Sequence, residues 1–244
     1  MINTIFFDLY GTLAGFSPDR YKIQSQACAK FGYKVTRDGI TRGYAIADNF
    51  MSKQNQVYPI RNMNSQKKKK FFSQYQKFIL SGDEINISEL TATKIWDYIK
   101  KIPYDLACYD DVFPSLKTLK SKGFQLGLIS NMNTDGNNLS LKLGLSNYLD
   151  FIITSKDANS EKPHKKIFMR ALGQAKVSAE NCIHVGDQII SDINGARNAG
   201  ITPVLIDRDS IHNDFKECKR IISLAELYKI IKWFQIWNFF IEIY

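Results

Sequence analysis

One stretch constrains the fold of this chain more than any other, and it runs from Thr4 to Leu13 as Thr-Ile-Phe-Phe-Asp-Leu-Tyr-Gly-Thr-Leu. Its first half is rich in strand formers, so we expect a buried strand that ends at Asp8. Gly11 then allows a tight turn, and Thr12 places a hydroxyl beside it. A carboxylate at the end of an apolar strand is costly unless it has a partner or a task. The stretch therefore predicts a functional aspartate at a sheet edge, with helix capping as the alternative role.

Two later apolar runs also end in polar side chains. The run 126–130 ends in Ser130 and is followed by Asn131, while the run 182–186 is followed directly by Asp187. Parallel strands present their carboxyl ends at one edge of a sheet, where ligands bind in open α/β folds. We therefore expect these side chains to lie near the first aspartate. Helix capping by the hydroxyl and amide, and a turn role for the acid, are the alternatives.

Two further polar residues accompany these runs. Lys162 precedes Pro163 at a predicted helix start, and Asp192 follows the last of the runs. A lysine by itself is usually a solvated surface residue, and Asp192 by itself could serve only its own helix. Their position between and after the strand-end motifs favours a functional role. His184, which lies inside an apolar run, is interpreted as a buried core histidine.

Strand and helix patterns alternate through most of the chain. Strands are predicted over 3–8, 124–130, 150–154, 182–186 and 202–206. Helices are predicted over 111–122, 136–144, 164–175, 190–199 and from 222 onward. This alternation predicts an α/β fold with a doubly wound, Rossmann-like parallel sheet and right-handed crossovers.

Residues 15–104 break the alternation. Helical patterns dominate this part, over 23–31, 39–53, 67–80 and 88–99. We therefore expect a smaller all-helical domain at 15–104, inserted into an α/β core domain formed by residues 1–14 and 105–244.

Composition excludes several classes of protein. The net charge of +9 suits an anionic ligand, but the chain shows no zinc-finger or nucleic-acid-binding motif, so nucleic acid is not an expected partner. The basic run Lys67–Lys70 is interpreted as a solvated helix face, with a polyanion site as the alternative. Four cysteines without paired spacing argue against a disulfide framework. With no apolar run of ~18 residues and no signal peptide before the first strand, we expect a cytoplasmic protein that does not span a membrane.

The carboxyl-terminal segment 233–244 is dense in aromatic residues. Three readings remain open for it: packing against the core, a homodimer contact, or an anchor at a membrane surface.

The order of nucleophilic acid, hydroxyl, lysine and acid resembles the haloacid dehalogenase superfamily. The resemblance covers most of the chain outside residues 15–104, which are similar to the helical cap that many members carry after the first strand. It implies a hydrolase in which the carboxylate of Asp8 attacks the substrate. It further implies a Mg²⁺ ion held by Asp8, Asp187, Asp192 and the backbone carbonyl of Tyr10. Substrate contacts are implied for Thr12, Ser130, Asn131 and Lys162, with Asp192 also able to orient the lysine.

The chain departs from the phosphatase pattern at Tyr10. Phosphatases of this superfamily usually carry there a second aspartate, which acts as general acid and base, whereas a phenol with an ordinary pKa of about 10 is a poor base at neutral pH. The metal-independent (S)-2-haloacid dehalogenases resemble this chain in having Asp-x-Tyr-Gly-Thr. They also use a cap arginine, for which Arg37, Arg42 and Arg61 are the possibilities in this sequence.

Asp187 argues against a dehalogenase, because the dehalogenases carry serine and asparagine where this chain has Gly186 and Asp187. An added carboxylate beside Asp8 would repel an anionic haloacid unless a cation lay between them. The favoured reading is therefore a Mg²⁺-dependent phosphatase acting on a small phosphate ester, with Tyr10 assigned to the catalytic set. The dehalogenase, and a protein that binds a phosphate ligand with little turnover, remain the alternatives.

Overall fold

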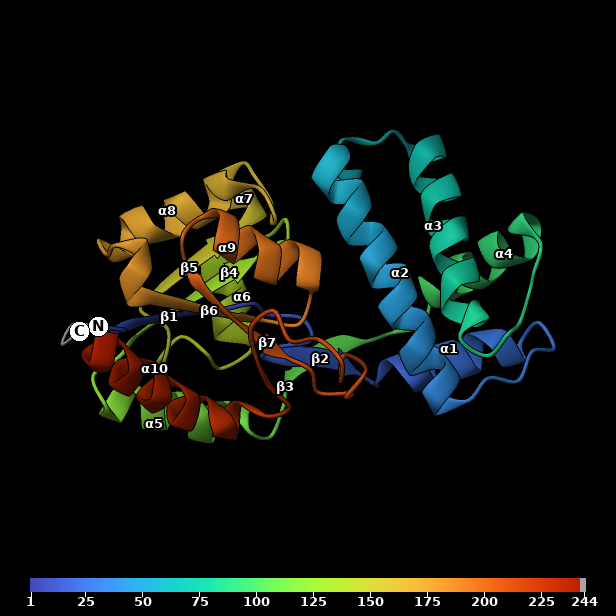
Figure 1. The fold of residues 1–244 in the computed structure, drawn as a ribbon. Coiled ribbons are helices and arrows are strands. Elements are labelled where there is room, and N and C mark those ends of the chain that lie inside the picture. Colours follow the sequence, from blue (N-terminus) through green and yellow to red (C-terminus); the bar gives the residue numbers. More distant parts are fainter. Residues whose placement is uncertain (242–244) are drawn as a thin grey trace. The chain divides into compact units, whose positions relative to one another are not determined.

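The computed structural model describes the backbone of residues 1–241 and the side chains of residues 1–234. The chain divides into two compact units, which are described separately (Figure 1). One unit combines Met1–Gly15 with Cys108–Tyr244, and the other is Phe16–Ala107.

The first unit is built on a six-stranded sheet with the order β5-β4-β1-β6-β7-β8, in which every neighbouring pair is parallel. In chain order its strands are β1 (Thr4–Phe7), β4 (Gln125–Ser130), β5 (Phe151–Thr154), β6 (Cys182–Gly186), β7 (Thr202–Ile206) and β8 (Lys219–Ile221). Phe7 of β1 pairs with Leu128 of β4 and with Val185 of β6. This register brings the carboxyl ends of three strands together, and the predicted α/β fold with a parallel sheet is confirmed.

Helices cover both faces of the sheet (Figure 1). On one face lie α5 (Val112–Ser121) and α10 (Leu227–Ile241), and on the other lie α8 (Lys165–Ala175) and α9 (Gly195–Asn198). Two shorter helices, α6 (Gly136–Lys142) and α7 (Ser155–Ala158), flank β5 in the chain. The side chains of β1 are completely buried at Ile5, Phe6 and Phe7, because this strand has neighbours on both edges and helices on both faces.

Two predicted helices differ from those observed. The segment predicted as one helix over 190–199 is a π-helical turn, Ile189–Asn194, that continues into α9. The helix predicted from 222 begins later, because the chain first forms β8 and a 3₁₀ turn at Leu224–Glu226. Ser223 and Glu226 form a capping box at this turn, in which each side chain accepts a hydrogen bond from a backbone N–H at the other residue's position.

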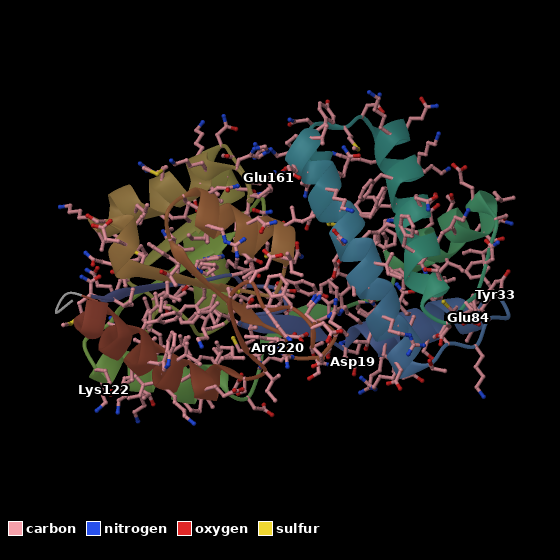
Figure 2. All side chains as sticks on the ribbon, viewed as in Figure 1. Asp19, Tyr33, Glu84, Lys122, Glu161 and Arg220 are labelled. Atoms are coloured by element: carbon pink, nitrogen blue, oxygen red, sulfur yellow. The ribbon has the colours of Figure 1, made fainter. Side chains whose placement is uncertain are left out.

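The second unit contains the helices α1 (Arg20–Ala29), α2 (Arg37–Val57), α3 (Ser65–Ser81) and α4 (Glu89–Ile99), with a 3₁₀ turn at Ile60–Asn62. A polar side chain caps the amino end of each of the four, and Asp19, labelled in Figure 2, accepts from the Lys22 amide at 2.8 Å. A Cβ at Gly43 would lie 1.8 Å from the Ile79 carbonyl oxygen. Glycine is therefore needed where α2 and α3 pack backbone to backbone.

The chain passes between the units through a two-stranded sheet of β2 (Ala14–Ser17) and β3 (Asp105–Cys108). These short strands were not predicted, since four residues hold too little of an alternating pattern to distinguish a strand from a loop.

The aromatic carboxyl-terminal segment is helical as far as Ile241. Trp233 is 42% exposed, and the Lys219 ammonium lies 3.8 Å from the centre of its ring. The side chains beyond residue 234, on which the homodimer prediction for 233–244 chiefly depends, lie outside the described residues. Within the described part of the chain, no helix combines the length and the apolar character needed to cross a membrane.

Candidate active site

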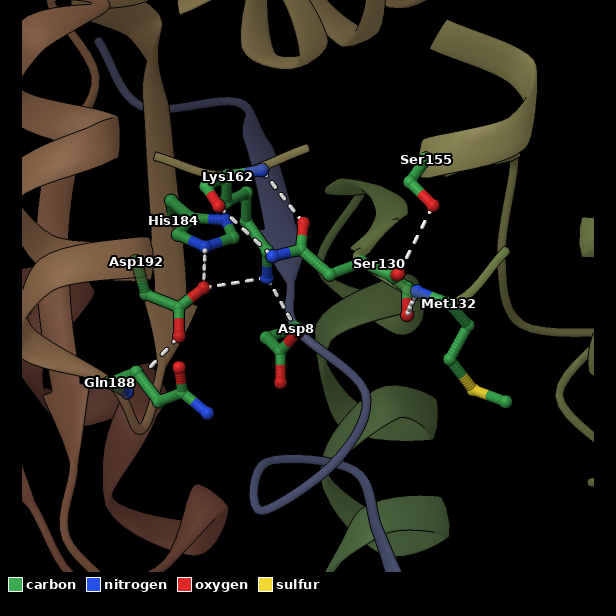
Figure 3. A network of polar contacts seen from close by, with 9 residues as sticks. Asp8, Ser130, Met132, Ser155, Lys162, His184, Gln188 and Asp192 are labelled. Atoms are coloured by element: carbon green, nitrogen blue, oxygen red, sulfur yellow. Dashed lines mark hydrogen bonds and ion pairs between the residues drawn. The ribbon is translucent and has the colours of Figure 1, made fainter. Parts of the chain in front are cut away.

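A buried lysine joins two carboxylates at the carboxyl end of the sheet (Figure 3). Asp8 follows β1 directly, and its backbone N–H donates to the Val185 carbonyl at 2.8 Å, so it continues the strand by one residue. The Lys162 ammonium lies 2.5 Å from Asp8 Oδ1 and 2.6 Å from Asp192 Oδ1. Lys162 is only 1% exposed, so this charge is held almost entirely by its two partners.

The two carboxylates have opposite pKa shifts. Burial raises the pKa of Asp8 to about 6, against the attraction of Lys162. Burial acts in the same direction on Asp192, but Lys162 and the hydrogen bond from His184 outweigh it and lower the pKa of Asp192 to about 2. Burial lowers the pKa of Lys162, yet the two carboxylates overcome this and raise it above its usual value. Asp192 and Lys162 are therefore charged at neutral pH, and Asp8 loses its proton just below it.

Asp192 is held by groups on β6 and on the π-helical turn. The Gln188 N–H donates to its Oδ2 at 3.1 Å, and His184 Nε2 lies 2.9 Å from its Oδ1. Burial lowers the pKa of His184, so its ring is neutral at pH 7, and Nε2 carries the hydrogen because Asp192 is ionised. A Cβ at Gly186 would lie 2.2 Å from Asp192 Cγ. The π-helical turn thus places the Asp192 carboxylate directly against Gly186, where any residue with a Cβ would clash with it.

Asp187 completes a group of three acids. One ligand oxygen from each of Asp8, Asp187 and Asp192 lies within 4.8 Å of the others. Gly11 lies directly against Asp187, because a Cβ at Gly11 would be 2.2 Å from Asp187 Oδ2. Gly11 also has a φ of +86°, a backbone conformation that favours glycine. The tight turn predicted after the first strand is therefore what lets two loops approach each other.

Asn131 binds the backbone of Lys162 at both ends of its amide. Its Nδ2 donates to the Lys162 carbonyl at 3.0 Å, and its Oδ1 accepts from the Lys162 N–H at 2.7 Å. Ser155 in turn donates to the Asn131 carbonyl at 3.0 Å. Ser130 is buried at the end of β4, and its hydroxyl oxygen accepts from the Met132 N–H at 3.2 Å (Figure 3). The amide side chain is thus engaged with the lysine rather than directed at open space.

The remaining predicted site residues lie on the loop after β1. Thr12 is completely buried, and within the described part of the chain its hydroxyl has no hydrogen-bond partner. Tyr10 is half-buried and forms an isolated bridge with Ala14. The structure therefore brings Asp8, Lys162, Asp187 and Asp192 into one cluster, with Asn131 behind the lysine and Thr12 on the adjoining loop.

The three arginines considered for halide binding lie in the second unit. Arg37 pairs with Asp19 at 3.2 Å, and Arg42 donates to the Gly82 carbonyl at 2.9 Å. The Arg61 carbonyl accepts from Lys68 at 3.2 Å.

The sequence does not predict several contacts of the site, and those of His184 and Arg208 are two of them. His184 was correctly expected to be buried, but its contact with Asp192 was missed. The signal available was its spacing from Gly186, since residues two apart on a strand face the same side. Arg208, whose side chain donates to the Thr12 carbonyl, carries no sequence signal of this kind.

Comparison with known proteins identifies the family of this chain. Residues 5–206 match the model of the haloacid dehalogenase-like hydrolase family, and the chain belongs to this family of hydrolases. The resemblance identified from the four motifs is thereby confirmed.

Individual relatives differ in how much of the chain they match. A glyceraldehyde 3-phosphate phosphatase of Methanopyrus kandleri is 35% identical over 101 residues, which cover 41% of this chain and 43% of that protein. A protein of the same name from Methanothermobacter thermautotrophicus is 26% identical over 95% of this chain and 100% of its own length. The solved structure of a 2-haloacid dehalogenase from Pseudomonas syringae covers 96% of this chain and 100% of its own, with 22% identity and a TM-score of 0.56. That likeness establishes the fold and leaves the reaction open.

Proposed function

We propose that this protein is a Mg²⁺-dependent phosphatase that acts on a small phosphate ester, with Asp8 as the nucleophile. The observation that carries the proposal is the group of three acids, Asp8, Asp187 and Asp192, gathered beside the buried Lys162. The names of the two archaeal relatives, which are phosphatases of a small sugar phosphate, support the same reaction class.

The donor atoms of the site suit Mg²⁺, which prefers oxygen ligands and usually keeps several of its waters. Two oxygens of Asp192 already accept hydrogen bonds from Lys162 and Gln188. Asp8 and Asp187, together with the Tyr10 carbonyl, are the groups proposed to hold the ion. Asp192, the third acid of the group, is proposed to orient the lysine or a metal-bound water. A bound Mg²⁺ would supply positive charge against the phosphoryl oxygens.

The side chains divide the remaining work among them. The Asp8 carboxylate attacks phosphorus, and the ester P–O bond breaks as the acyl phosphate forms on Asp8, so that the alkoxide leaves and takes up a proton from water. Water then hydrolyses the acyl phosphate, which releases inorganic phosphate and restores the carboxylate. Lys162 holds a fixed positive charge at that oxygen and keeps the carboxylate oriented. The buried hydroxyl of Thr12 and that of Ser130 can donate hydrogen bonds to phosphoryl oxygens. Asp8 must be ionised to attack, and the positive charges of Lys162 and of a bound Mg²⁺ would both favour the ionised carboxylate.

Tyr10 favours a second candidate function. It stands where the phosphatases of this family usually carry the acid that protonates the leaving group, and a halide leaves without a proton. A metal-independent 2-haloacid dehalogenase is therefore the runner-up. Asp187 counts against it, since a second carboxylate within reach of Asp8 would repel an anionic haloacid. The third candidate is a protein that binds a phosphate ligand with little turnover, because Tyr10 stands in place of the general acid that turnover would need.

The helical unit, Phe16–Ala107, is proposed to be the cap domain that chooses the substrate. Its own hydrophobic core, centred on buried residues such as Ile79, Leu80 and Ile95, allows it to act as a separate body.

A paired assay tests the proposal. Phosphate release from p-nitrophenyl phosphate is followed with and without Mg²⁺, and halide release from 2-chloropropionate is followed in EDTA. We expect phosphate release that requires Mg²⁺, that Asp8→Asn abolishes and that Asp187→Asn weakens. Halide release in EDTA would instead establish the dehalogenase. Tight binding of phosphate without release in either arm would establish the binding protein.

A further inference from the structure

The loop that follows Asp8 is closed on itself by backbone hydrogen bonds. The Leu9 carbonyl accepts from the N–H groups of Leu13 and Ala14, both at 2.8 Å, and the Gly11 N–H donates to the Ala14 carbonyl at 2.9 Å. This turn presents Gly11 to Asp187. The turn thus connects the two carboxylates proposed to hold the metal ion, because it follows Asp8 in the chain and contacts Asp187.

One side chain far along the sequence holds the outer end of this turn. Arg208 donates two hydrogen bonds to the Thr12 carbonyl, from Nη2 at 2.7 Å and from Nε at 3.2 Å. Its guanidinium also lies 4.1 Å from the centre of the Tyr109 ring, and its side chain is only 16% exposed. Contact with an aromatic face and several donors held in one plane fix the orientation of an arginine in a way that a lysine cannot reproduce.

Arg208 is itself held by Asp111. The two form a bidentate pair, with both nitrogen–oxygen distances at 3.0 Å. Asp111 Oδ2 also accepts from the Ser223 hydroxyl at 2.6 Å and from the Leu224 N–H at 2.8 Å. Burial raises the pKa of Asp111, but these donors outweigh it and the pKa is lowered, so the carboxylate stays charged. Through Asp111, Arg208 is thus connected to the start of α5 and to the segment before α10.

We propose that Arg208 is a positioning residue for the reaction of this site, an inference that rests on the proposed phosphatase function. It links the Thr12 carbonyl to Asp111 and thereby fixes the turn that follows the nucleophile and carries the Tyr10 carbonyl and Gly11. It touches no reacting atom. Displacements of about 1 Å in a catalytic group can lower a rate by about 10²-fold, so loosening this turn acts on catalysis through geometry alone.

The test compares Arg208→Met with a chemically matched control, Arg197→Met. Arg197, on α9, also binds one carboxylate and one backbone carbonyl, both belonging to Glu217 and both at 3.1 Å, and neither of these bonds involves the turn. With p-nitrophenyl phosphate, Arg208→Met should lower kcat by about 10–100-fold and raise the Mg²⁺ concentration for half-maximal activity. Arg208→Lys, which keeps one donor, should fall between this variant and the wild type, and Arg197→Met should stay within about twofold of the wild type.

Hydrogen exchange of the free protein gives a readout that needs no activity. In Arg208→Met, the amides of residues 9–14 should exchange faster, while those of β6 and α8 keep the wild-type rate. Faster exchange in all three segments, or unchanged exchange at 9–14, would overturn the positioning role. So would a kcat within twofold of the wild type. If the wild-type protein releases no phosphate, the proposed function fails, and the exchange experiment still decides whether Arg208 holds the turn.

Discussion

Replacing Lys162 with methionine removes the ammonium group that lies between Asp8 and Asp192 and leaves most of the side-chain volume in place. Both carboxylates are within 2.6 Å of that group, and Lys162 is 1% exposed. Removing one partner of a buried ion pair costs about 3–5 kcal/mol, because the remaining charge is left without compensation. For a chain of this size each kcal/mol lowers the Tm by about 2–4 °C, so the Tm should fall by about 6–20 °C.

The loss should depend on pH, and its sign follows from Asp8. The folded-state pKa of Asp8 is already raised to about 6, and without Lys162 it rises further. A carboxyl group with a raised folded-state pKa stabilises the fold while it is protonated, and this stability is lost as the pH rises through that pKa. In the wild type, Asp192 has a pKa lowered to about 2, so its contribution is present at neutral pH and is lost only in strong acid. The Tm deficit of Lys162→Met should therefore be larger at pH 8 than at pH 5.

Thermal unfolding followed by circular dichroism, in EDTA at both pH values, measures this effect. Lys120→Met is the matched control, because Lys120 pairs with Asp150 at the same 2.6 Å but both side chains are about one-third exposed. An exposed pair contributes about 0–1 kcal/mol, so this control should lose less than about 4 °C. A Tm for Lys162→Met within 2 °C of the control at both pH values, or a deficit that shrinks at pH 8, would refute the reasoning.

Three further predictions concern the turn, the missing acid and a buried thiol. Gly11→Ala should lower the free energy of unfolding by more than the roughly 1–2 kcal/mol expected for a positive φ alone, because the added Cβ would also meet Asp187. Urea denaturation should show a smaller loss for the control Gly32→Ala, where φ is +82° but nothing lies within 4 Å of the added Cβ. Equal losses in the two variants would contradict the contact. Tyr10→Asp should raise Mg²⁺-dependent phosphate release by about 10²-fold if only the general acid is missing. The substrate for this test is an alkyl phosphate such as glycerol 2-phosphate, whose leaving group needs a proton, and a fall in the rate would speak against a phosphatase pocket. Burial raises the pKa of Cys28 to about 12, so iodoacetamide at pH 8 should not modify this thiol until the protein is denatured. Mass spectrometry measures the modification, and rapid labelling of Cys28 in the native chain would contradict the prediction.

The sequence determined those features of the molecule that depend on local pattern. Runs of strand-forming residues set β1, β4, β5, β6 and β7. Their alternation with helical segments determined a parallel sheet, since parallel neighbours need a crossover. The same alternation placed Asp8 and Asp187 at strand ends, because the position of a residue along its strand is local information.

Only the tertiary structure decided how these side chains meet. Lys162 bonds a carboxylate 154 positions away, and Arg208 bonds a carbonyl 196 positions away. Such contacts depend on the path of every intervening loop, and no period in the sequence records them. The π-helical turn at Ile189–Asn194 has the same origin, since its helical pattern alone predicted an ordinary helix. In this turn the buried carboxylate of Asp192 contacts Lys162, His184 and the Gln188 amide together. A buried charge is stable only when hydrogen-bonding partners surround it, so these three contacts determine the geometry of the turn.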